Sequence, residues 1–153
     1  HPRVRRQRQM CIRDRGMTAM CPNEHMEKEE TEYVKRLLES FGRVEVVPER
    51  LMDVVVSVSG SSPAYVFMMI EAMADAAVSG GMPRAQAYQF AAQAVYGSAK
   101  MVLETGKHPG ELKDMVCSPA GTTIEGVRIL EKNGFRSAVF EALQGAADKG
   151  KKM

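Results

Sequence analysis

The sequence predicts a mainly α-helical protein in which a short strand–helix–strand unit precedes a helical domain. After residue 48, most segments carry apolar residues at helical spacing. Aromatic residues make up only 6% of the 153 residues and tryptophan is absent, while methionine (12 residues) and alanine are abundant. Such a composition suits helices that pack through small and flexible side chains, and it argues against a β-sandwich.

Residues 1–15 differ in composition from the rest of the chain. They contain six arginines and one aspartate and show no helical or strand periodicity. One interpretation is a basic arm that binds nucleic acid. We favour the other, a disordered or non-native tail, which is best left out of fold reasoning. The remaining residues carry 15 basic and 18 acidic side chains, so no nucleic-acid partner is predicted.

Residues 16–48 read as two short strands joined by a helix. The first strand is Met17 to Cys21, which is apolar and is followed by Pro-Asn. A helix from Glu27 to Phe41 has acidic residues in its first turns and a glycine after it. The second strand, Val44 to Val47, is β-branched and stops at a proline. Strand–helix–strand units of this kind usually belong to a larger sheet.

The next segment predicts a short helix, a turn and a long helix. The short helix runs from Glu49 to Val58 and leads into a glycine-serine turn at Gly60. Ser62 is expected to cap the long helix, with Pro63 at its first position. Apolar residues then recur at helical spacing until Gly80.

A second long helix, from Arg84 to Glu104 and stopped by Gly106, is apolar or small on most of its sides. Its small residues are Ala85, Ala87, Ala91, Ala92, Ala94, Gly97, Ser98 and Ala99. A helix of this kind is usually buried. A domain of about one hundred residues leaves little room to enclose it, so we expect a second copy of the chain to cover it. A central helix inside a monomeric bundle is the alternative.

Three shorter helices complete the expected fold. They cover Pro109 to Val116, Ile124 to Lys132 and Phe135 to Lys149, and Asn133-Gly134 separates the last two. His108 lies at a helix start before a proline, so we expect a structural role for it instead of a catalytic one.

The loop Cys117 to Thr123 is the candidate site, because it is small, rich in hydroxyls and lies between two helices. Thr122 and Glu125 have the spacing of a capping box, which predicts that a helix starts here. Unpaired amides and a partial positive charge at a helix N-terminus suit a carboxylate or phosphate, and Ser118 and Thr123 add hydroxyls. An ordinary helix–loop–helix corner is the alternative.

Other classes of site find little support in the sequence. The three cysteines, Cys11, Cys21 and Cys117, lack metal-ligand spacing, so no metal is predicted, and Cys117 is expected to pack. An odd number of cysteines without a secretory signal favours free thiols in a reducing cytosol. No apolar run approaches the length of a membrane span. We therefore expect a cytoplasmic chain without a membrane partner.

Two separated motifs resemble one enzyme family. The run DMVCSPAGTTIEGVRILE, residues 114–131, resembles the C-terminal signature of the pyrroline-5-carboxylate reductases. The run VSGSSPAYVFMMIEAMADAAVSGGMPRAQA, residues 58–87, resembles the opening of the helical domain in that family. The similarity extends from Gly16 to Met153 and stops before the arginine-rich tail. The Gly-Gly usual in the signature is Ala120-Gly121 here.

The resemblance implies a domain organisation. Residues 16–48 would be the end of a dinucleotide-binding (Rossmann) domain. Residues 49–153 would be a helical dimerisation and substrate domain similar to the C-terminal domain of 6-phosphogluconate dehydrogenase. The expected partner is a second copy, as a homodimer or a higher homo-oligomer.

The resemblance also implies the reaction, which is reduction of 1-pyrroline-5-carboxylate to L-proline with NADPH or NADH. Backbone amides around Gly121 to Thr123 would bind the substrate carboxylate, and Ser118 and Thr122 would line the same pocket. Thr123 matches the family threonine whose hydroxyl lies beside the imine nitrogen, and it is the expected catalytic residue. Ser59 and Ser61 are weaker candidates for the far wall of the pocket.

The spacing Gly-x-Gly-x-x-Gly, which would cradle the pyrophosphate of the cofactor, does not occur among the 13 glycines. By comparison with the family we expect a fragment that cannot turn over alone. Two alternatives stay open: a related imine or ketone reductase, and a non-catalytic helical dimerisation module. The hydroxyl-rich loop favours an enzyme, because a scaffold has no need of Ser118, Thr122 and Thr123 together.

Overall fold

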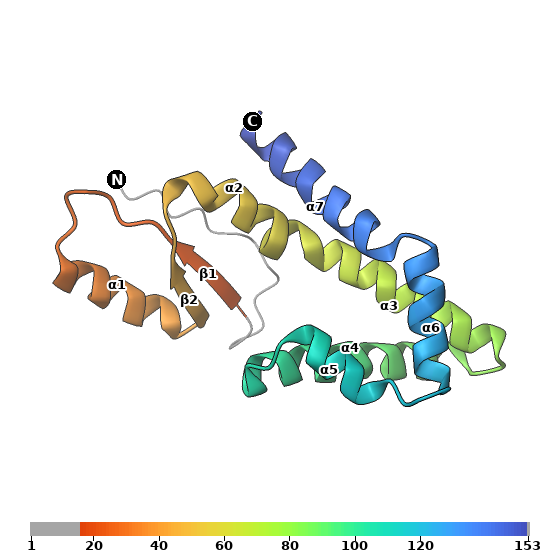
Figure 1. Ribbon diagram of the computed structural model, residues 1–153. Helices are drawn as coiled ribbons and strands as arrows, with labels where there is room; N and C mark the ends of the chain where they lie inside the picture. The colour runs from red at the N-terminus through yellow and green to blue at the C-terminus, as the bar shows by residue number, and fades with distance from the viewer. Residues whose placement is uncertain (1–15, 153) are drawn as a thin grey trace. The chain divides into compact units, whose positions relative to one another are not determined.

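The computed structural model describes residues 16–152 (Figure 1). The predicted basic tail, residues 1–15, lies outside the described part. By their internal contacts the described residues form two compact units, one made of residues 16–63 and 141–152 and the other of Ala64–Phe140. The domain boundary that we place at residue 48 stays a prediction.

The first unit contains the predicted strand–helix–strand. Strand β1 is Gly16–Met20, helix α1 is Lys28–Glu39 and strand β2 is Gly42–Val46. The strands pair in parallel, with Gly16 opposite Gly42. A Cβ on Gly42 would lie 2.1 Å from the Gly16 carbonyl oxygen, so only glycine permits this close pairing. The small core of the unit includes Met20 and Val44.

One unbroken helix of 31 residues, Glu49–Ser79, follows β2 (Figure 1). It consists of a 3₁₀ turn η1 (Glu49–Leu51), α2 (Met52–Val55), a π-helical segment η2 (Val56–Ser61) and α3 (Ser62–Ser79).

The predicted turn at Gly60 and the predicted N-cap at Ser62 are therefore wrong. The Ser62 hydroxyl donates to the carbonyl of Val58, one turn earlier in the same helix. Pro63 would interrupt a regular α-helix, because it has no N–H to donate and its ring would clash with the carbonyl of Ser59. The π-helical segment directly before it widens the helix at this point.

The helix Glu49–Ser79 also corrects the expectation that no segment reaches the length of a membrane span. Within the described residues, it alone is long and apolar enough by length and composition, with a mean hydropathy of 1.3 over its best window. Only 6% of that window is buried within this chain. An apolar helix that a second copy of the chain covers would have a similar length and composition.

The second unit starts with the helices α3 and α4, which are joined by Gly80-Gly81. Helix α4 is Arg84–Thr105 and ends at Gly106 in the left-handed conformation (φ 64°), as predicted. The Arg84 guanidinium bonds Asp75 of α3 across this connection and lies 5.6 Å from the ring centroid of Tyr88. The pKa of Arg84 is raised, chiefly by this hydrogen bond to Asp75.

The buried residues of the second unit are all alanines of α3 and α4, namely Ala74, Ala87 and Ala91. Many of the large apolar side chains of these helices are exposed. Those at least half exposed are Phe67, Met68, Phe90, Tyr96 and Leu103. The chain by itself leaves this surface uncovered, although burying it would favour a compact state.

The remaining helices match the predicted ones closely. They are α5 (Pro109–Val116), α6 (Thr122–Lys132) and α7 (Phe135–Lys151). The stop between α6 and α7 uses both expected residues: the side-chain amide of Asn133 donates to the Ile129 carbonyl at 2.8 Å, and Gly134 has a φ of 72°.

Candidate functional site

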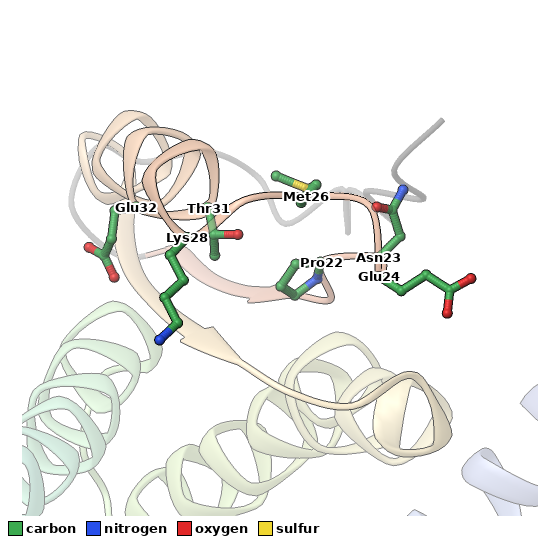
Figure 2. Close-up of a pocket in the computed structure, with 7 residues that line it drawn as sticks. All are labelled: Pro22, Asn23, Glu24, Met26, Lys28, Thr31 and Glu32. Carbon is green, nitrogen blue, oxygen red and sulfur yellow. The ribbon is translucent and has the colours of Figure 1, made fainter.

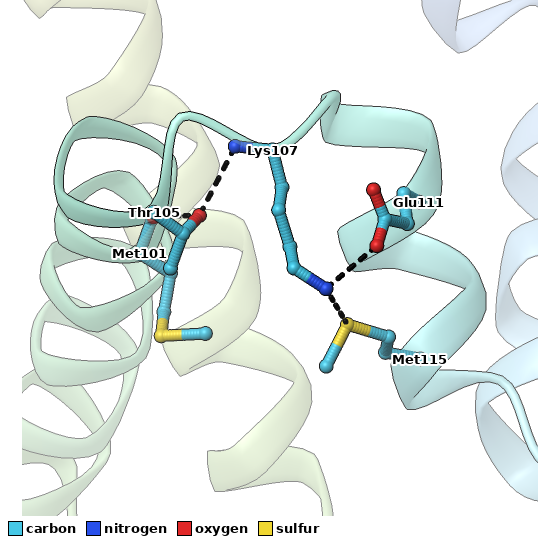
Figure 3. Close-up of polar contacts among 5 residues, drawn as sticks. All are labelled: Met101, Thr105, Lys107, Glu111 and Met115. Atoms are coloured by element: carbon cyan, nitrogen blue, oxygen red, sulfur yellow. Dashed lines mark hydrogen bonds and ion pairs between the residues drawn. The ribbon is translucent and has the colours of Figure 1, made fainter.

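Helix α5 positions the first side of the candidate site, and His108 caps it. The His108 Nδ1 atom accepts a hydrogen bond from the Gly110 amide at 3.0 Å. Lys107 lies in the connection before α5 and contacts two residues of this helix. Its Nζ atom lies 2.6 Å from the Glu111 carboxylate and 3.9 Å from the Met115 sulfur (Figure 3). The capping contact accounts for His108 in a structural role.

A tight turn follows α5. Helix α5 ends where the Cys117 amide donates to the Asp114 carbonyl at 3.1 Å. The Gly121 amide then donates to the Ser118 carbonyl at 3.0 Å. Pro119 stands second in this four-residue turn, and Ala120 stands third with a φ of 56°. Proline second and a positive φ third are the features of a type II turn.

The turn brings the Ser118 hydroxyl against the first residue before α6. A Cβ added to Gly121 would lie 2.3 Å from the Ser118 Oγ and 3.1 Å from its carbonyl oxygen. The Ser118 side chain therefore occupies the space that a side chain at position 121 would need. Two predicted site residues, Ser118 and Gly121, lie in direct contact.

The start of α6 differs from the predicted capping box by one residue. Gly121 is the N-cap, with extended backbone (φ −77°, ψ 167°), and Thr122 is already helical. The Glu125 carboxylate does not turn back to the cap. It pairs with Arg128, at 2.8 Å from Nε and 2.6 Å from Nη2, and this hydrogen-bonded pairing lowers the pKa of Glu125. A helix does start in this loop, as predicted, but it begins at Thr122 instead of Ile124, and the capping box is wrong.

The surroundings of this helix end favour an anion. The amides in the first turn of a helix have no acceptor within the helix and carry a partial positive charge. The Gly121 amide is engaged in the turn, so those of Thr122 and Thr123 are the next available donors. Ser118, Thr122 and Thr123 are all exposed in this chain. The arrangement can hold a carboxylate and place hydroxyls beside it.

The other candidate residues make different contacts. Cys117 is a half-buried free thiol. The Ser59 hydroxyl donates to the Val55 carbonyl at 2.9 Å within the long helix, and a pocket role for it and for Ser61 stays a prediction. Within residues 16–152, no group of three or more His, Cys, Asp or Glu side chains could hold a metal ion.

An open hollow of about 410 Å³ lies in the first unit (Figure 2). Its residues are far in the sequence from the predicted site residues. It is lined by Pro22, Asn23, Glu24, Met26, Lys28, Thr31 and Glu32. None of these side chains was predicted to bind a ligand, and the hollow contains no residue of the Ser118–Thr123 loop.

Comparison with known proteins gives a consistent result. The family model described as pyrroline-5-carboxylate reductase dimerisation matches residues 49–153. The pyrroline-5-carboxylate reductase of Escherichia coli is 64% identical over 138 residues, which are 90% of this chain and 51% of that protein. The enzyme of Methanosarcina acetivorans is 48% identical over 136 residues, 89% of this chain and 50% of that protein. The chain thus spans about half the length of these relatives.

Solved structures agree with this result. A pyrroline-5-carboxylate reductase from Coxiella burnetii matches with a TM-score of 0.85 at 31% identity, covering 89% of this chain and 51% of that one. A Plasmodium falciparum pyrroline carboxylate reductase with NADP bound matches with a TM-score of 0.80 at 33% identity, covering 89% and 55%.

Proposed function

Because this chain belongs to the pyrroline-5-carboxylate reductase family, we propose that it supplies the substrate-carboxylate site and the self-association surface of an enzyme that reduces 1-pyrroline-5-carboxylate to L-proline. The turn from Ser118 to Gly121 at the start of α6 carries this proposal. It combines free helix amides with three hydroxyl groups in one loop, and the substrate combines a carboxylate with an imine nitrogen.

Three residues of the loop receive a role, namely Ser118, Thr122 and Thr123. The amides of Thr122 and Thr123 bind the substrate carboxylate, because the Gly121 amide already bonds the Ser118 carbonyl. The Thr123 hydroxyl donates a hydrogen bond to the ring nitrogen, which gains a proton when the C=N bond is reduced. The Ser118 hydroxyl lines the same pocket and limits how the ring can turn.

The hydride would come from a reduced nicotinamide cofactor, NADPH or NADH. The residues of this chain do not fit such a cofactor, because the sequence has no Gly-x-Gly-x-x-Gly turn and the described sheet has only the two strands β1 and β2. We therefore assign no step of the reaction to a cofactor site here. That one relative binds NADP supports NADPH as the first cofactor to assay with the whole enzyme.

Proline binding tests the proposal, because proline is the product and carries the same carboxylate beside the nitrogen of a five-membered ring. We expect the full chain to bind proline in calorimetry. Thr123→Val should weaken binding by about tenfold, roughly the net value of one hydrogen bond. Thr123→Ser, which keeps the hydroxyl, is the matched control and should bind as the wild type does.

Equal affinity of the Val and Ser variants would remove Thr123 from the site. Binding of other cyclic imino acids in preference to proline would favour a related imine reductase. An oligomer that binds none of them would favour the non-catalytic dimerisation module. The cytoplasmic location stays a prediction, and cell fractionation tests it.

A further inference from the structure

The stop between α6 and α7 contains an asparagine followed by a glycine, Asn133-Gly134, and this pair has a chemistry of its own. The backbone nitrogen after an asparagine can attack the side-chain carbonyl carbon Cγ. A C–N bond forms, the nitrogen gives its proton to the side-chain amide, and that amide leaves as ammonia. Water then opens the cyclic imide to aspartate or isoaspartate. Glycine permits the attack best, because it has no Cβ to crowd the nitrogen.

Asn133 is the asparagine of this chain whose surroundings in the sequence favour the reaction. The other asparagine, Asn23, is followed by Glu24, whose side chain crowds the attacking nitrogen. Both asparagines are exposed, so water reaches both. The difference between them lies in the next residue and in how the fold holds each side chain.

The folded chain keeps the reacting groups of Asn133 and Gly134 apart. The Asn133 side-chain amide donates to the Ile129 carbonyl at 2.8 Å, and the Gly134 amide, which is the nucleophile, donates to the Glu131 carbonyl at 3.0 Å. Closing the imide ring requires the Asn133 Cβ and the Gly134 nitrogen to be eclipsed about the Cα–C bond. The ψ of 11° at Asn133 turns them far apart. Both hydrogen bonds must therefore break, and the backbone must rotate, before the attack.

We propose that Asn133 is a modification site, which deamidates when the connection between α6 and α7 opens and is protected while it is closed. After the reaction the stop cannot re-form as before. An ionised aspartate side chain has no N–H to donate to the Ile129 carbonyl. Its negative charge lies at the C-terminal end of α6, where the helix dipole favours cations. The modification thus converts a transient opening into a lasting one.

Deamidation of the full chain in native buffer and in urea tests the protection. Peptide mapping by mass spectrometry follows the replacement of the amide by a hydroxyl at each asparagine. In urea we expect Asn133 to convert faster than Asn23. In the folded chain Asn133 should convert at least about tenfold more slowly than in urea, because hydrogen bonds worth that factor must break first. Equal rates at Asn133 in the two conditions, or faster conversion of Asn23 in urea, would overturn the proposal.

Two aspartate substitutions test the lasting effect. Asn133→Asp removes the donor to Ile129 and adds the charge, so we expect its Tm to fall by about 2–6 °C. Asn23→Asp is the matched control, because the Asn23 Oδ1 atom accepts a hydrogen bond from the His25 amide at 3.0 Å and a carboxylate oxygen accepts it as well. Its Tm should be unchanged. A Tm for Asn133→Asp at or above that of the wild type would refute the lasting effect.

Discussion

Gly121 stands where any larger residue would displace the Ser118 side chain. A Cβ at this position would lie 2.3 Å from the Ser118 Oγ and 3.1 Å from the Ser118 carbonyl oxygen. The hydroxyl can rotate away, but the carbonyl belongs to the turn and has less freedom. We expect Gly121→Ala to lower the free energy of unfolding by about 1–3 kcal/mol, the usual range for overpacking. Urea denaturation measures this change.

Gly126 offers the matched control in the same helix. A Cβ added to Gly126 meets no atom within 4 Å in this chain. Alanine is the better helix former, so Gly126→Ala should raise the free energy of unfolding by roughly 0.5–1 kcal/mol. Effects of the same sign for the two substitutions would contradict the close contact between Ser118 and Gly121.

The ion pair between Glu125 and Arg128 predicts a pH dependence. Its hydrogen bonds lower the pKa of Glu125 in the folded chain. The pair therefore stabilises the fold above the pKa of an unfolded glutamate, and this contribution disappears as the pH falls through the lower folded pKa. Both side chains are exposed, so the effect on stability is small.

The change in pKa is measurable directly. In an NMR titration of the side-chain carboxyl, Glu125 should titrate below its ordinary value, and Arg128→Gln should return it to that value. Arg36→Gln in α1, in the other unit, is the control and should leave the Glu125 titration unchanged. Added salt should weaken the difference, as for any exposed pair. If the pKa of Glu125 is the same in the wild type and in Arg128→Gln, the two side chains do not pair in solution.

At the residue scale, sequence predicted the composition of the site but not its local conformation. Ser118, Thr122 and Thr123 identified the loop, because hydroxyls beside a helix start are visible in the sequence. The cap was misplaced by one residue, because Thr122 and Gly121 are both acceptable N-caps. The turn that begins at Ser118 decides between them, and alanine does not signal the positive φ that Ala120 has in this turn.

At the scale of elements, the helices with strong end signals were predicted closely. Gly106 ends α4, and Asn133-Gly134 separates α6 from α7, as the sequence indicates. The exception is the stretch around Gly60. Glycine, serine and proline usually mark a turn and a new helix, but serine hydroxyls can also bond helix carbonyls, as Ser57 and Ser59 do here. A π-helical segment let one helix continue through these residues.

Pro63 provides a test of this explanation. Pro63→Ala restores an amide donor and removes the ring, so the helix no longer needs the wider segment before it. We expect the free energy of unfolding to rise, by less than the ~3 kcal/mol that proline costs inside a regular helix. Hydrogen exchange of the amides from Val56 to Ser61 should slow in parallel.

Pro83→Ala is the control for Pro63→Ala. Pro83 is the N-cap of α4, a position where even a residue with an N–H would make no hydrogen bond within the helix. It should be neutral or slightly destabilising, since proline restricts the unfolded chain. A loss of stability in Pro63→Ala would mean that the packing of the proline ring outweighs its cost to the helix.

At the scale of the whole molecule, many of the large apolar residues in the composition lie on the surface of this chain. The described residues bury few large apolar side chains, and their buried hydrophobic residues are Met20, Val44, Ala74, Ala87, Ala91 and Ala147. The sequence predicted that α4 would be covered, but the described residues of this chain leave most of it exposed. The match to a dimerisation family supports a homo-oligomer, in which the small residues would allow close helix contact.

Phe90 tests that assembly. Its side chain is 66% exposed on α4 in this chain, and a second copy would bury it. Placing a charge there would leave a carboxylate without a partner in an apolar interface, which is costly. We expect the wild-type chain to sediment as a dimer or larger homo-oligomer and Phe90→Glu to shift its mass to that of a monomer in analytical ultracentrifugation.

Tyr33 of α1 is the matched control, because it is also an aromatic residue with 66% exposure but lies in the other unit. Tyr33→Glu should leave the mass unchanged, since we expect the exposed apolar side chains of α3 and α4 to form the self-association surface. A shift to monomer with Tyr33→Glu and not with Phe90→Glu would move the interface to the strand–helix–strand unit. A wild-type chain that sediments as a monomer would mean that α4 does not pack against a second copy, and the exposed side chains of α3 and α4 would then need another partner.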